Sequence, residues 1–207
     1  MRTLPFARTI AAGLVAVCTL TAQEQAPRHE IGLTLGGLFG PSRDEAATKV
    51  NPDAGIAFQA NYGYRLFGGR KAAVYGEVHF LASPNRGVES TNLNATRDFA
   101  SLFVTPGIRV KLKPAARVSP YVVVGGGYGQ FEQSTYLLNG DPNPAARRVH
   151  RGVFDYGAGV DAKLWRFVGL RAEIRDFYSG SPLYNLPTQS GGQHNVVAGG
   201  GLVLRFR

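Results

Sequence analysis

The residues best suited to chemistry are three of the four histidines, His79, His150 and His194, and one serine. His79 and Ser83 lie four positions apart in the stretch VHFLAS. A serine nucleophile needs a base oriented beside it, and this spacing does not match such a pair. His150 and His194 lie too far away in the sequence to suggest a local metal site with His79. We therefore predict no catalytic residue, no metal site and no cofactor.

Two glycine-rich runs could be mistaken for phosphate-binding loops. They are GGGYG at 125–129 and AGGG at 198–201, and neither is followed by Lys and Ser or Thr. A phosphate-binding loop also leads into a helix, and no segment of this chain shows the pattern of an amphipathic helix of three turns. We interpret these glycines as strand residues instead.

Charged residues recur at every second position in the segment 154–175, FDYGAGVDAKLWRFVGLRAEIR. Phe154, Tyr156, Val160 and other apolar residues alternate with Asp155, Asp161 and further polar residues or glycines. The alternation resumes after a break at 165–167. A period of two indicates a strand whose two faces have different surroundings.

Six further segments are predicted strands, so that the chain has eight; five of the six show the same alternation, and in the segment 121–138 the glycines obscure which residues share a face. The approximate ranges of the eight are 30–40, 54–67, 72–82, 99–112, 121–138, 154–164, 168–175 and 195–206. Long polar connections at 41–53, 83–97, 139–151 and 179–194 alternate with the short links GGRK, KPAARVS and WRF. This arrangement predicts an all-β fold, an eight-stranded antiparallel up-and-down barrel.

The apolar face of these strands is expected to touch lipid. Backbone groups in hydrocarbon need internal partners, so a sheet crosses a membrane only as a closed barrel. A barrel of eight strands is just wide enough for side chains to fill it. We therefore expect the inward charges to pair in a lumen network consisting of Glu77, His79, Asp155, Asp161, Lys163, Arg171, Glu173 and Arg175. Inward glycines would make room for the long arginine and lysine side chains.

The N-terminus has the layout of a secretory signal peptide. Arg2 and Arg8 precede an apolar run at 10–20, which is too short to span a bilayer, and small residues end at Ala22. We expect residues 1–22 to be removed and 23–207 to form one outer-membrane barrel domain. Cys18, the only cysteine, lies within the predicted signal peptide, so the mature chain would have no thiol chemistry.

The basic charge is concentrated at the short links. Without residues 1–22, which hold two of the 23 basic residues and no acid, 21 basic residues remain against 14 acidic ones. The stretches 65–71, 109–117, 163–166 and 205–207 are basic without any acid. We interpret them as anchoring charge at the membrane edge. A contiguous nucleic-acid face with stacking aromatic residues is not suggested.

Three local features refine the predicted barrel. Aromatic residues predict two interfacial girdles, with Tyr64, Phe67, Tyr121, Trp165, Phe167 and Phe206 at the short-link end and Phe39, Phe80, Phe131, Phe154 and Tyr178 at the long-loop end. Pro106 cannot donate to a strand ladder, which predicts a bulge or local distortion. Asp176, in phase with the apolar face, is expected to lie beyond the hydrocarbon.

The whole mature chain resembles the small eight-stranded outer-membrane β-barrels, the group that includes the OmpA transmembrane domain and opacity-type proteins. The resemblance rests on the signal peptide, PYVVVGGGYG, LRAEIRDF and the closing strand AGGGLVLRFR. It implies a Gram-negative outer membrane, surrounding lipid and lipopolysaccharide, and recognition of the last strand by the barrel assembly machinery. Family members usually end on an aromatic residue, whereas here Arg207 follows Phe206.

The predicted function is therefore a structural or surface-interaction barrel without enzyme activity, whose extracellular partner the sequence does not name. Arg147, Arg148 and Arg151 are candidate contacts for lipopolysaccharide phosphates. A lipid A-modifying enzyme is a competing hypothesis, although a deacylase of this kind would carry His-x-Ser-Asn on an outward strand face. The sequence also leaves open a narrow passive pore and a soluble lipocalin-like barrel, whose interior should be apolar.

Overall fold

The computed structural model describes residues 27–45, 48–186 and 191–207. The predicted signal peptide at 1–22 lies outside these residues. The described part of the chain forms strands, turns and loops, and it contains no helix that is long and apolar enough to cross a membrane.

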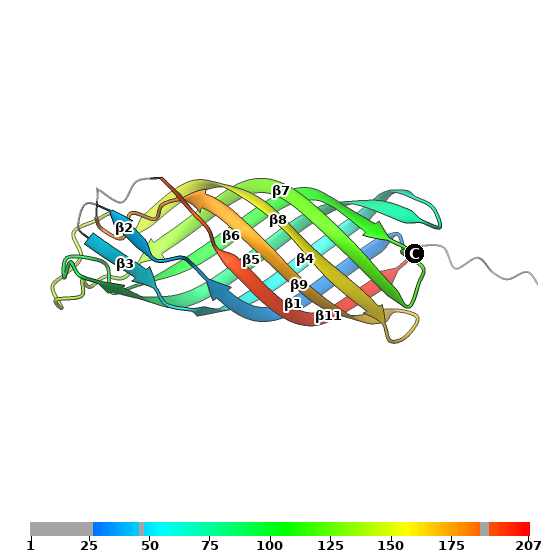
Figure 1. The fold of residues 1–207 in the computed structure, drawn as a ribbon, viewed down its shortest axis with the longest axis horizontal. Coiled ribbons are helices and arrows are strands. Elements are labelled where there is room, and N and C mark those ends of the chain that lie inside the picture. Colours follow the sequence, from blue (N-terminus) through cyan, green and yellow to red (C-terminus); the bar gives the residue numbers. More distant parts are fainter. Residues whose placement is uncertain (1–26, 46–47, 187–190) are drawn as a thin grey trace, which may run out of the picture.

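Eight long strands form the wall of a barrel (Figure 1). They are β1 (His29–Phe39), β4 (Gly55–Gly68), β5 (Ala72–Ser90), β6 (Asp98–Leu112), β7 (Val118–Gln133), β8 (Arg148–Lys163), β9 (Val168–Gly180) and β11 (Val196–Phe206). Each pairs antiparallel with the next one along the chain. The ring closes where β1 pairs with β11, from His29 opposite Phe206 to Phe39 opposite Val196. This confirms the predicted eight-stranded up-and-down barrel.

Three short strands lie at the long-loop end. β2 (Arg43–Glu45) pairs with β3 (Thr48–Pro52), which pairs with the end of β5, and β10 (Gly192–Gln193) pairs with β9. Figure 1 shows β2 and β3 at the end of the barrel opposite the C-terminus. The long connection between the first two wall strands is therefore partly a small sheet.

Several wall strands extend further toward the long loops than the alternation predicts. β5 continues to Ser90, β8 begins at Arg148 and β9 continues to Gly180, within segments expected to be loops. The predicted ranges were wrong there because hydrophobic alternation records a contrast between apolar and polar surroundings. A strand that continues beyond the lipid-facing part of the wall keeps its hydrogen bonds to neighbouring strands, but its apolar and polar residues no longer alternate.

The outward face of the wall is apolar and the inward face is enclosed. Leu33 and Ile174 expose more than half of their side chains, at 55% and 54%, whereas Glu173 and Arg175 expose 6% and 1%. This confirms the predicted facing of the strands. Of the two effects predicted for Pro106, the structure shows a local distortion and not a bulge: Val104 pairs with Tyr128 and Gly107 with Gly125 in one register, and the β6–β7 pairing is interrupted between them. The β6–β7 ladder skips the proline and then continues.

Candidate functional site: a filled barrel interior

The half of the interior nearer the short turns is filled by charged side chains. Glu30 of β1 accepts hydrogen bonds from Lys111 Nζ at 2.5 Å and from Arg109 Nη2 at 2.8 Å. Lys111 Nζ also lies 2.6 Å from Asp161 Oδ2, which links β6 to β8. Arg109 also contacts Glu77 of β5: Arg109 Nε lies 3.1 Å from Glu77 Oε2. Carboxylates of three strands are therefore joined by two cations of one strand.

Arg175 connects this network across the barrel. Its guanidinium contacts Glu77 and Glu173, and its Nη1 donates to Asp155 Oδ2 at 3.0 Å. The contact with Glu77 joins β9 to β5, which lie on opposite sides of the ring of wall strands. Side chains from opposite walls thus meet in the middle of the interior.

The network is balanced in charge. Five carboxylates, those of Glu30, Glu77, Asp155, Asp161 and Glu173, face five cations, those of Arg109, Lys111, Arg171, Arg175 and Arg205, and all ten side chains are buried. A buried charge is tolerated when it is paired and hydrogen-bonded. Glycines provide the space, since a Cβ atom on Gly63 would meet Arg109 Nη2 and one on Gly32 would meet Arg171 Nη1.

Seven of the eight residues predicted for the lumen network are brought together inside the barrel. Lys163 is the exception: it is half-buried at the last position of β8, at the short-turn end. The prediction missed Glu30, Arg109, Lys111 and Arg205, which the structure places in the network. On the sequence alone, Arg109, Lys111 and Arg205 fall among the basic stretches at the membrane edge. Their alternation with outward Ile108, Val110 and Leu204 could have shown that they point inward.

His79 and Ser83 also lie inside the barrel. His79 Nε2 lies 3.2 Å from Gln59 Oε1, and its Nδ1 lies 3.9 Å from Glu77 Oε1. The imidazole also packs 5.5 Å from the ring of Phe177. Ser83 is fully buried. Both side chains are therefore turned away from the lipid-facing wall.

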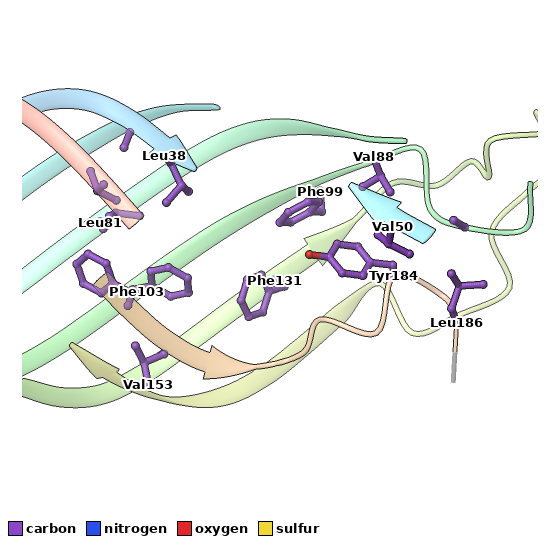
Figure 2. Close-up of a cluster of buried hydrophobic side chains, with 14 residues drawn as sticks. Leu38, Val50, Leu81, Val88, Phe99, Phe103, Phe131, Val153, Tyr184 and Leu186 are labelled. Carbon is purple, nitrogen blue, oxygen red and sulfur yellow. The ribbon is translucent and has the colours of Figure 1, made fainter. Parts of the chain in front are cut away.

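The half of the interior nearer the long loops is apolar. This differs from the sequence-based expectation of a polar inward face. Phe103 stacks on Phe177 with ring centroids 5.4 Å apart and meets Phe131 edge-on at 5.5 Å. Figure 2 shows Phe103 and Phe131 with aliphatic side chains from β1, β3, β5, β8 and the loop after β9. We call this set the hydrophobic cap; its buried members are Leu38, Val50, Ala57, Leu81, Val88, Ala95, Phe99, Phe103, Phe131, Val153, Phe177, Tyr184, Leu186 and Val197.

Loop residues complete the hydrophobic cap. Tyr184 is fully buried, packs 5.4 Å from the ring of Phe99 and donates a hydrogen bond to Gln193 Oε1 at 2.5 Å. It is the middle residue of Leu183, Tyr184 and Asn185, all of which have positive φ angles, of 68°, 48° and 62°. Such angles are unfavourable for residues other than glycine. The turn therefore depends on the contacts that Tyr184 makes inside the barrel.

One cation lies within this apolar half. Arg86 exposes 1% of its surface, donates from Nε to the carbonyl of Asp53 at 3.0 Å and lies over the ring of Phe99 at 5.1 Å. A Cβ atom on Gly55 would contact Arg86 Cγ, so glycine makes room here too.

The three arginines predicted to contact lipopolysaccharide lie at the long-loop rim and differ in their surroundings. Arg147 Nη2 and Arg148 Nε lie 2.8 and 3.4 Å from the carboxylate of Glu132, and both side chains remain largely exposed. Arg151 instead donates from Nε to the carbonyl of Ser181 at 2.8 Å. Arg147 and Arg148 share one carboxylate, whereas Arg151 ties β8 to the loop after β9.

A polar group interrupts the apolar outer wall near the long loops. Asp176 accepts hydrogen bonds from Tyr156 OH at 2.8 Å and from the backbone N–H of Asn195 at 3.2 Å, and it lies 2.6 Å from His194 Nδ1. The sequence pattern does not pair these side chains, because they come from β8, β9 and the segment before β11. The hydrogen bonds explain how Asp176 is accommodated on the outward face.

The aromatic girdles are largely where the sequence predicts them. Phe39, Phe80, Phe154 and Tyr178 are exposed near the long loops, and Phe67, Trp165, Phe167 and Phe206 are exposed near the short turns. Tyr64 is half-buried there. Tyr121 and Phe131 are corrections: Tyr121 donates to Glu173 Oε2 at 2.8 Å inside the barrel, and Phe131 belongs to the hydrophobic cap. Both lie in phase with the inward face of β7.

Comparison with known proteins agrees with this architecture. The outer membrane protein β-barrel domain family model matches residues 9–206. The structure is similar to OprG from Pseudomonas aeruginosa, with a TM-score of 0.59 and 14% identity over 89% of this chain and 98% of OprG. It is also similar to Neisserial surface protein A, with a TM-score of 0.53 and 13% identity over 88% of this chain and 100% of that protein. No curated protein sequence shows a significant match. The chain belongs to the outer membrane protein β-barrel family, and it is a transmembrane barrel of a Gram-negative outer membrane.

Proposed function

We propose that the protein is a closed, non-catalytic barrel whose long-loop rim is an interaction surface at the outside of the cell. The observation that carries the proposal is the filling of the interior at two levels. The charge network joins opposite walls through Arg175 and Glu77, and the hydrophobic cap lies above it. A narrow passive pore would need a continuous aqueous path through both layers.

Single-channel recording tests the closed interior. Refolded protein in a planar bilayer should give no discrete openings in concentrated KCl. Glu77→Ala combined with Arg175→Ala removes the contact across the barrel without changing the net charge, and we expect it to increase the leak. Heat-modifiable gel mobility verifies that each sample is folded. Regular ohmic openings of the unmodified protein would contradict the proposal.

The outer rim offers a site for phosphate groups of lipopolysaccharide. Arg147 and Arg148 present two guanidinium groups to solvent against the single carboxylate of Glu132, and guanidinium groups bind phosphate with paired hydrogen bonds. Arg147→Ala, Arg148→Ala and Arg151→Ala together should weaken lipopolysaccharide binding. Arg97→Ala is the control for the loss of a single exposed arginine, because Arg97 is also exposed and pairs with Asp98; it should leave binding unchanged. Unchanged binding by the triple variant would remove this site.

One observation favours a second candidate function, modification of lipid A. His194 is half exposed and pairs with Asp176 on the outward wall, and a carboxylate can orient a histidine for proton transfer. We expect lipid A to have the same mass with and without the protein in cells. A change in acylation that is lost in His194→Ala would favour the enzyme. A change that is lost in His79→Ala would assign the same activity to the interior histidine.

A further inference from the structure

A cavity of about 120 Å³ lies at the short-turn end of the barrel, away from the outer rim. We call it the inner-rim pocket. Its lining includes Lys163, Arg166, Arg205 and Arg207, with Phe167 and Phe206 beside them. The space is several times the roughly 30 Å³ that a water molecule occupies in the liquid. A polyatomic anion can therefore enter.

Two cations of the pocket, Arg166 and Arg207, lie outside the lumen network, and Arg205 lies at the edge of that network with long contacts. Arg205 is buried, yet its Nη2 lies 3.5 Å from Asp161 and its Nε lies 3.9 Å from Glu30, and neither nitrogen has a hydrogen-bond partner in the described part of the chain. Asp161 and Glu30 already accept closer contacts from Lys111. Arg166 lies over the ring of Phe167 at 5.0 Å. Within residues 27–45, 48–186 and 191–207, no Asp or Glu forms an ion pair with Arg166 or Arg207.

The surroundings of the pocket indicate where its ligand comes from. Trp165, Phe167 and Phe206 are exposed beside it, with 75%, 52% and 39% of their surface accessible. Aromatic residues of this kind mark the level of lipid headgroups. The turns at 65–71, 113–117 and 163–167 carry basic residues and no acidic ones, and clustered basic residues at a membrane edge attract anionic lipids.

We propose that the inner-rim pocket binds the phosphodiester headgroup of an anionic phospholipid from the periplasmic leaflet. The guanidinium groups of Arg166 and Arg207 bind the phosphate oxygens, because the planar fork of arginine matches phosphate geometry. Phe167 and Phe206 contact the start of the acyl chains. A free phosphate ion has the same charge chemistry but gains nothing from these rings, so the lipid is the favoured source.

The only tryptophan of the chain provides a local probe, since Trp165 adjoins Arg166. Protein refolded into phosphatidylcholine vesicles is compared at equal mole fractions of brominated phosphatidylglycerol and brominated phosphatidylcholine. We expect phosphatidylglycerol to quench Trp165 more strongly. Arg166→Gln with Arg207→Gln should reduce the apparent preference at least about fivefold, since one basic residue near an anionic surface contributes about that factor.

The matched control is Arg70→Gln with Lys71→Gln, which removes the same charge from the turn between β4 and β5, outside the pocket. This variant should keep the preference. An equal loss in both double variants would show diffuse attraction and overturn the proposal, as would equal quenching by both lipids. A saturable Trp165 response to inorganic phosphate in detergent, without a preference among vesicles, would assign the pocket to a free anion and also overturn it.

Discussion

Asp161 and Arg171 face each other across the β8–β9 ladder and are joined by two parallel hydrogen bonds inside the barrel. Arg171 Nε lies 2.8 Å from Asp161 Oδ1, and Nη2 lies 2.9 Å from Oδ2. Both side chains are enclosed. Arg171 also donates from Nη1 to Asn61 Oδ1 at 3.0 Å, which ties β9 to β4. The pair thus connects β8, β9 and β4 within the network that spans the interior.

Asp161→Asn should destabilise the barrel strongly. The change leaves the buried charges of Arg171 and Lys111 without one of their carboxylates, and removal of one partner of a buried ion pair costs about 3 to 5 kcal/mol. Arg171→Lys keeps the charge but loses the two-pronged contact, so it should cost less. A guanidinium titration in lipid vesicles, followed by gel mobility, measures both. Equal free energies of unfolding for Asp161→Asn and the unmodified protein would show that the pair is not structurally important.

Gly63→Ala should also destabilise the protein, although it adds one methyl group. A Cβ atom at this position would meet Arg109 Nη2 and would displace the guanidinium that bridges Glu30 and Glu77. Overpacking of a filled interior costs about 1 to 3 kcal/mol. Gly152→Ala is the control within a strand, since a Cβ atom there would have no neighbour within 4 Å. If the two variants unfold at the same denaturant concentration, glycine is not needed to accommodate Arg109.

For most wall strands the sequence predicts which way a residue points, because alternation depends only on the contrast between lipid and interior; the glycine-rich β7, with Tyr121 and Phe131, is the exception. Asp155, Asp161, Arg171, Glu173 and Arg175 are inward as expected. Contacts across the barrel cannot be inferred in this way. The approach of Arg175 to Glu77 depends on the closure of the ring at β1 and β11, which no local pattern encodes.

Alternation also does not predict how deep inside the barrel an inward-facing residue lies. Lys111 and Lys163 both follow the inward phase of their strands, yet Lys111 is buried between Glu30 and Asp161 whereas Lys163 is half-buried at the rim. The hydrophobic cap was missed for a related reason. Val50 and Tyr184 come from polar segments whose sequences show no periodicity, and only the folding of β3 and of the loop after β9 brings them over the interior.

Phe103→Ala should weaken the hydrophobic cap. Phe103 contacts both Phe131 and Phe177 and is fully buried, so truncation would leave a cavity and cost about 3 to 5 kcal/mol. Phe80→Ala is the control of equal size on the outward wall, where lipid can fill the space. Denaturant titration should show the larger loss for Phe103→Ala. A larger loss for Phe80→Ala would mean that lipid contact, and not the cap, stabilises this end of the barrel.

Tyr184→Ala should release the loop after β9 while the wall of the barrel stays folded. The turn at 183–185 has three successive positive φ angles, and each such residue costs on the order of 1 kcal/mol or more. The buried ring of Tyr184 offsets this cost through Phe99 and Gln193. Limited proteolysis of protein in vesicles should therefore cut this loop faster in Tyr184→Ala. Tyr184→Phe keeps the ring packing and loses only the hydroxyl hydrogen bond, so it should be cut at an intermediate rate. If both variants resist the protease as well as the unmodified protein does, the strained turn is held by the backbone alone and the cap does not anchor the outer rim.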